Sequence, residues 1–145
     1  MTDIIKYTYN VRDVNHRYQM IHNDIFGLSV RKLAAAMVKG QSVPVIKHED
    51  ELKKLQEKLT EIQSALDTLP QSELKIRRGR EILSTLSNYV AALTKSIIYL
   101  QKICNDKNRL SGTDSKLVND RKLYDDAIQH HKTLGVKLNS LLSSF

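Results

Sequence analysis

The stretch HEDELKKLQEKLTEIQSALDTL, residues 48–69, decides the fold. Its apolar residues recur at alternating spacings of three and four, at Leu52, Leu55, Leu59, Ile62, Leu66 and Leu69. This is the a/d pattern of a heptad repeat, which places the apolar side chains on one narrow stripe of an α-helix. The acidic start suits the positive end of a helix dipole, and Pro70 stops the segment. We therefore predict a helix over about 47–69 that packs along one seam.

Two longer helices are predicted after this one. Residues 71–106 carry a stripe that runs from Ile82 to Cys104 and is widened by Leu83, Val90 and Ile98. A stripe of this width indicates contact with more than one neighbour, so we expect this helix to be central. Residues 114–144 repeat their apolar positions seven apart, at Leu117, Tyr124, His131, Leu138 and Phe145. Between the two, residues 105–113 are typical of a turn.

The first helix is predicted over about 10–39. Its stripe begins at Val11, and Gly27 marks either a bend or a break into two shorter helices. The alternating Tyr7-Thr8-Tyr9 before it favours an extended N-terminal arm. Short connections favour antiparallel neighbours. The sequence thus predicts an all-α protein, an elongated antiparallel helical bundle of about four helices with coiled-coil-like heptad packing, in which residues 1–145 form a single domain.

The composition supports this fold class and suggests a compartment. A chain of 145 residues with 5 Gly and 2 Pro is poor in the turns that a β-sandwich needs. Its one cysteine, Cys104, excludes an intrachain disulfide and fits a reducing compartment. Residues 1–10 show no signal peptide, and the most apolar window, 89–100, is shorter than the ~20 residues of a membrane span. We expect no membrane partner and a cytoplasmic location, or the host cytoplasm if the chain is viral or an effector.

His131 is the most conspicuous single residue, because it occupies an apolar heptad position of the last helix. Gly135 follows it by one turn, in the run His131-Lys132-Thr133-Leu134-Gly135. The run resembles the His-x-x-Lys-Gly segment of histidine phosphotransfer domains, which are also four-helix bundles and whose glycine exposes the imidazole. Leu134 stands where that family has a lysine. Two interpretations are open: a buried histidine with a polar partner, or a phosphotransfer residue.

No catalytic, cofactor or metal site is predicted. The chain has no Glu-x-x-His pair of the kind that di-metal bundles use, and its single cysteine disfavours a zinc site. The five glycines are isolated, so no phosphate-binding loop is present. Nothing assembles a nucleophile, a base and an oxyanion donor, and we expect the protein not to be an enzyme.

The strongest charge feature is the basic run 75–80, in a chain whose formal net charge is +7. The run places Lys75, Arg77, Arg78 and Arg80 in the predicted first turns of the central helix, where the helix dipole prefers acids. Arg31 and Lys32 form a second, looser group. These residues could bind phosphates or the carboxylates of a partner, although a solvated face is the ordinary role of such a run.

Three functions follow in order of preference. The first is a non-enzymatic role in protein–protein interaction or assembly, as an adaptor, regulator or structural component, with another protein or a second copy as the partner. Heptad patterning on helices of unequal length favours it, since such helices leave surfaces that others can join. The alternative is a nucleic-acid-binding accessory protein that uses the basic surface. The third is a histidine phosphotransfer-like bundle.

Overall fold

The computed structural model describes residues 3–26, 46–75, 78–108 and 114–143. They form four α-helices and one short 3₁₀ helix: α1 (Asp3–Phe26), α3 (Ile46–Asp67), η1 (Gln71–Lys75), α4 (Gly79–Asn108) and α5 (Asp114–Ser143). No strand occurs within these ranges. The predicted all-α helical bundle is therefore confirmed.

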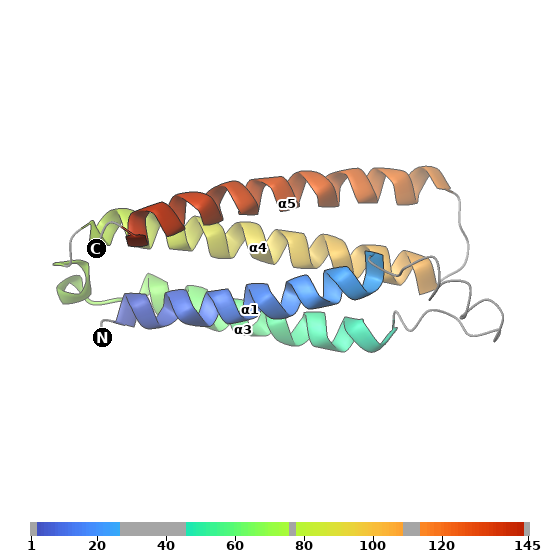
Figure 1. The fold of residues 1–145 in the computed structure, drawn as a ribbon. Coiled ribbons are helices and arrows are strands. Elements are labelled where there is room, and N and C mark those ends of the chain that lie inside the picture. Colours follow the sequence, from blue (N-terminus) through green and yellow to red (C-terminus); the bar gives the residue numbers. More distant parts are fainter. Residues whose placement is uncertain (1–2, 27–45, 76–77, 109–113, 144–145) are drawn as a thin grey trace.

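The helices run up and down in sequence order, so that both termini lie at the same end of an elongated bundle (Figure 1). α4 packs against α5, α3 and α1, which makes it the central helix, as predicted. α3 packs against α1 and α4. α1 and α5 also run antiparallel, but they pack far less closely than these pairs. None of the helices in the described ranges is both long and apolar enough to cross a membrane.

The core is built from the predicted stripes. The five stripe positions of α3 from Leu52 to Leu66 are all buried, and so are those of α4 from Ile82 to Leu100. Burial of these aliphatic side chains, at roughly 1.5–3 kcal/mol each, is the main source of stability. Ile98 is an exception, because 44% of it is exposed. The prediction that Ile98 widens the buried stripe was wrong, since α4 turns that side chain away from all three neighbours.

The first helix begins earlier than predicted. α1 starts at Asp3, so Tyr7-Thr8-Tyr9 is helical and the predicted extended arm was wrong. The apolar stripe of α1 continues backwards through the buried Thr8 to the buried Ile4. The Thr8 hydroxyl donates a hydrogen bond of 2.9 Å to the Ile4 carbonyl, which satisfies it inside the helix. The predicted end at residue 39 and the bend at Gly27 lie outside the described residues.

The long central helix is interrupted near its predicted start. Residues 71–75 form η1, and α4 begins only at Gly79, after Arg78 adopts a left-handed φ of 58°. Gly79 is needed here, because a Cβ at this position would lie 2.7 Å from the Leu74 carbonyl oxygen. Of the described residues of the basic run, Lys75 therefore ends η1, Arg78 precedes α4 and Arg80 lies within α4. At its other end α4 continues to Asn108, through part of the predicted turn 105–113.

Candidate functional site

A buried polar cluster joins α1 to α5. The hydroxyls of Tyr18 and Tyr124 lie 2.5 Å apart, and the Tyr124 hydroxyl lies 2.6 Å from Nδ1 of His22. Both tyrosines are buried, with at most 2% of each exposed. The long side chains thus connect two helices whose backbones do not approach closely. We call Tyr18, Tyr124 and His22 the tyrosine–histidine relay.

The charge of His22 determines which groups of the relay donate and which accept hydrogen bonds. Burial, and then the positive charges of Arg121 and Lys132, lower the pKa of His22, so its ring is neutral at pH 7. In the neutral tautomer that carries its proton on Nε2, Nδ1 accepts a hydrogen bond from Tyr124, which in turn accepts one from Tyr18. Every hydroxyl hydrogen then has an acceptor, as buried polar groups require. Burial raises the pKa of Tyr18 to about 12 and raises that of Tyr124 as well, so both stay protonated.

His131 lies beside the relay and is also buried, with 2% exposed. Its Nδ1 is 2.7 Å from the Ser96 hydroxyl, which itself donates to the Ala92 carbonyl and so accepts from the imidazole. The rings of Tyr18 and Tyr89 meet the imidazole edge-on, at centroid distances of 5.7 and 6.1 Å. Burial, followed by the charges of neighbouring basic residues, lowers the pKa of His131 to about 4. His131 is therefore neutral at pH 7.

Gly135 has a different role from the glycine of phosphotransfer domains. A Cβ at Gly135 would lie 3.1 Å from Cε2 of Tyr89, so the glycine makes room for that ring between α4 and α5. It does not open a path to His131. With 2% of His131 exposed, the buried polar interpretation fits the geometry better than the phosphotransfer one.

The basic run gathers at one end of the bundle. Lys75 ends η1, Arg78 precedes α4 and Arg80 lies in its first turn, and all three side chains are exposed. None of the three forms an ion pair with another described residue. Arg77, Arg31 and Lys32 lie outside the described residues, so the structure does not place them.

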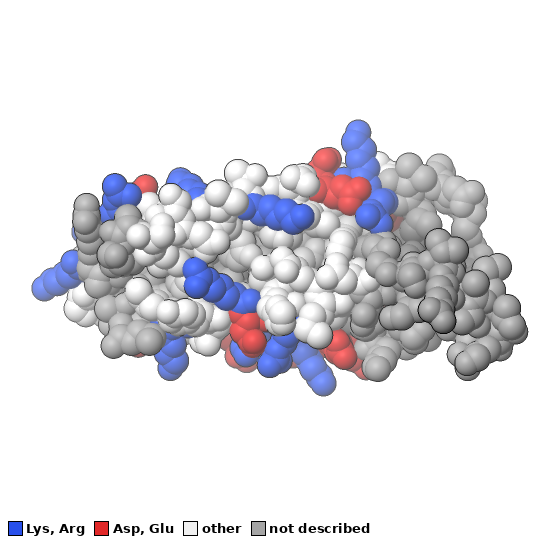
Figure 2. Space-filling model, in the orientation of Figure 1, with Lys and Arg blue, Asp and Glu red and all other residues white. Residues whose placement is uncertain are grey.

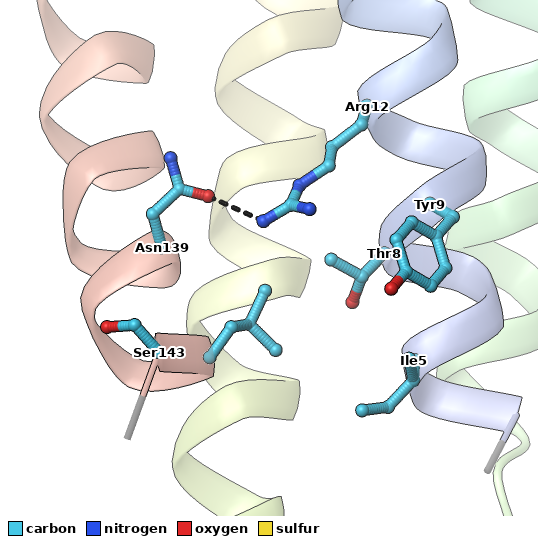
Figure 3. A pocket seen from close by; sticks show the side chains of 7 residues that line it. Ile5, Thr8, Tyr9, Arg12, Asn139 and Ser143 are labelled. Atoms are coloured by element: carbon cyan, nitrogen blue, oxygen red, sulfur yellow. Dashed lines mark hydrogen bonds between the residues drawn. The ribbon is translucent and has the colours of Figure 1, made fainter. Parts of the chain in front are cut away.

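An open pocket of about 520 Å³ lies between α1 and α5, near the end of the bundle that holds the termini. It is lined by Ile5, Thr8, Tyr9, Arg12, Asn139, Leu142 and Ser143. Figure 3 shows Arg12 of α1 reaching towards α5, where its Nη2 donates a hydrogen bond of 2.9 Å to Oδ1 of Asn139. The sequence prediction missed this site, since each lining residue looks unremarkable until α1 and α5 are placed side by side.

Exposed apolar side chains also lie on the two helices that form the pocket. Among the described residues, five large hydrophobic side chains are exposed, and three of them are Tyr9 (54%), Met20 (58%) and Val136 (70%). Tyr9 and Met20 are eleven residues apart, which places them on one face of α1. Val136 is three residues before Asn139, about 60° around α5 from it, and is not among the lining residues. We call the pocket and these three residues the α1/α5 seam.

The surface along the seam is largely uncharged, and Lys or Arg side chains reach over it (Figure 2). In the described part of the chain, no three His, Cys, Asp or Glu side chains gather in a way that could hold a metal ion. The seam thus offers apolar surface and hydrogen-bond donors, which suit it to bind another molecule. Comparisons with protein-family models, with curated proteins and with solved structures found no match to this chain.

Proposed function

We propose that the protein is a non-enzymatic helical bundle that binds another protein through the α1/α5 seam. The observation that carries the proposal is the exposure of Tyr9, Met20 and Val136, each more than half exposed, on α1 and α5, the two helices that border the loosely packed side of the bundle. Exposed apolar side chains that border a pocket are consistent with an interaction site. Grooves between helices commonly accept a further helix.

The interior supports the same role. Its polar groups bond to one another: Tyr18 to Tyr124, Tyr124 to His22, and His131 to Ser96. Groups engaged in this way hold helices together and are shielded from a substrate. A partner can therefore contact only the side chains of the outer surface.

Site-specific photo-crosslinking tests the proposal. A benzoylphenylalanine at Val136 or Met20 should form discrete adducts with a defined protein when the chain is exposed to an extract of its source, and excess unmodified chain should suppress them. The matched control places the same crosslinker at Lys58, which is exposed on α3. Light scattering of the purified chain distinguishes a second copy from a different partner. Equal adducts from Lys58, or none from the seam, would contradict the proposal.

Nucleic-acid binding is a second candidate, favoured by the exposed group Lys75, Arg78 and Arg80. Cations that lack protein carboxylate partners are suited to phosphates, and such binding weakens steeply with salt. Fluorescence anisotropy with duplex and single-stranded DNA at 50 and 200 mM salt, roughly the range over which phosphate contacts lose most affinity, tests this. Micromolar, salt-sensitive binding that is lost in the double variant Arg78→Glu/Arg80→Glu would support it, and no binding at the lower salt would rule it out.

A further inference from the structure

We propose that the occupant of the α1/α5 seam is an amphipathic helix of a different protein, which places a carboxylate of Asp or Glu on Arg12 beside an apolar side chain in the pocket. This inference rests on the proposed function and specifies the chemistry of the partner. It is carried by the geometry of Arg12, by the local balance of charge and by the composition of the pocket.

Arg12 is held in place but keeps most of its donors. One Nη2–H is used by Asn139, and the guanidinium carbon lies 5.8 Å from the centre of the Tyr9 ring. A guanidinium has five N–H groups, arranged so that two can bind both oxygens of one carboxylate. Arg12 forms no ion pair with a described residue. Its orientation is therefore fixed in advance, which lowers the entropic cost of binding an acid.

Two acidic residues near the seam already form ion pairs with basic residues of their own helices. Asp13 pairs with Arg17 at 3.4 Å, and Asp125 pairs with Arg121 at 3.1 Å, each across one helical turn. No acidic residue lines the pocket. Arg12 is thus an uncompensated positive charge in this part of the seam. A complementary partner is negative here, since like charges across an interface oppose association.

The residues that line the pocket indicate which side chain of the partner binds next to its carboxylate. Ile5 of α1 and Leu142 of α5 supply apolar surface, while Thr8, Tyr9 and Ser143 supply hydroxyls. A volume of about 520 Å³ holds a few side chains and not a whole element. In a helix, residues three or four apart project from one face. An acid and an apolar residue at that spacing could occupy the Arg12 end and the Ile5–Leu142 end together.

A second copy of the chain is a poorer occupant than a different protein. The two other exposed large hydrophobic residues in the described ranges are Ile98 and Leu123. Ile98 lies on the outer stripe of α4 between Lys95 and Lys102, and the one carboxylate that an ion pair places here, that of Asp120, is 4% exposed and already bound to Lys102 at 3.2 Å. Leu123 is only 37% exposed. On α3, which carries several exposed acids, no large hydrophobic side chain is exposed. Leu123 has the exposed Asp126 three residues further on, but it is a single, less exposed side chain and forms no apolar ridge.

Selection from a random library of helical peptides tests the inference with the purified chain. Wild-type protein should enrich peptides that carry Asp or Glu three or four residues from Leu, Ile, Met or Phe. Fluorescence anisotropy of the selected peptides should show affinity at least tenfold weaker for Arg12→Glu and for Val136→Asp, and a smaller loss for Arg12→Lys. Circular dichroism and a thermal melt confirm that each variant is folded.

Lys95→Glu is the matched control, because Lys95 is also exposed and also lies 5.8 Å from a tyrosine ring centre, on the outer face of α4. It should leave peptide affinity within twofold. Enrichment of basic peptides, or of acidic ones that bind Arg12→Glu as well as wild type, would overturn the inference. If seam crosslinks to a partner persist unchanged in Arg12→Glu, the proposed function stands and the acidic partner is wrong. If no crosslink forms from the seam, both are wrong.

Discussion

Acidification should destabilise the bundle through His131, and the size of the effect can be worked out. The pKa of His131 is about 4 in the folded chain, against 6.5 for an ordinary histidine. The unfolded chain therefore binds this proton about 300-fold more tightly. Because the folded-state pKa is the lower one, the stability that the neutral ring confers is complete above pH 6.5 and is lost as the pH falls towards 4. Between pH 7.5 and 4.5 the loss amounts to roughly 2.5 kcal/mol.

The perturbation that isolates this effect is His131→Leu. Leucine cannot titrate, and Ser96 keeps its hydrogen bond to the Ala92 carbonyl, so the substitution leaves no buried hydroxyl without a partner. At pH 7.5 the variant should be less stable by about 1–3 kcal/mol, since it loses two edge-on ring contacts and the bond to Ser96. At pH 4.5 the difference should vanish or reverse.

Urea unfolding followed by circular dichroism at several pH values measures both free energies. Groups that do not interact with His131 are present in both proteins and cancel in the comparison, and His22 is the least of the causes that lower the pKa of His131. The control is His130→Leu, which removes an adjacent but exposed imidazole that is a lesser cause of the lowered pKa of His131, so most of the loss of stability on acidification should remain. The reasoning is refuted if His131→Leu loses as much stability on acidification as wild type does, or if His130→Leu removes the same share.

Three further outcomes are expected in urea or thermal unfolding at neutral pH. Tyr124→Phe should lower the free energy of unfolding by about 1–3 kcal/mol, because it removes the common hydrogen-bond partner of Tyr18 and His22. Tyr18→Phe should lower it by less. Equal losses in the two variants would contradict the relay. Arg78→Gly should stabilise the protein by about 0.5–1 kcal/mol, since glycine adopts the left-handed φ without strain, whereas a loss of stability would show that the arginine side chain contributes here. Gly135→Ala should not bring the gain of about 1 kcal/mol usual for this change in a helix, because the new methyl group presses on a buried ring; a full gain would mean that the ring moves aside freely.

Periodicity predicted the helices well where apolar residues are regularly spaced. The buried stripe of α3 and the limits of α5 were predicted correctly, because regular heptad spacing indicates both the length of a helix and its buried face. The start of α1 was missed because Tyr7-Thr8-Tyr9 alternates like a strand, although Ile4 and Thr8 continue the helical stripe. The interruption before α4 was missed because it depends on a close approach of Gly79 to Leu74, which is a tertiary contact.

The candidate site was less predictable than the fold. His131 was visible as a histidine on an apolar stripe, and its buried environment is the kind expected for one. His22 attracted no notice, although it lies one turn after Tyr18. Arg12 and Asn139 are 127 residues apart, so only the pairing of α1 with α5 brings them together. A single sequence shows which face of a helix is buried but not which other helix covers it.

The tyrosine–histidine relay has a consequence for the alignment of the helices. Apolar stripes are repetitive, so two helices can slide by one heptad, about 10 Å, and still match apolar to apolar. A slide of α1 against α5 by that distance would break the hydrogen bond between the hydroxyls of Tyr18 and Tyr124. The bond therefore favours the observed vertical setting of α1 against α5. The relay thus fixes the alignment of α1 with α5, which keeps Arg12 level with Asn139 and preserves the shape of the pocket.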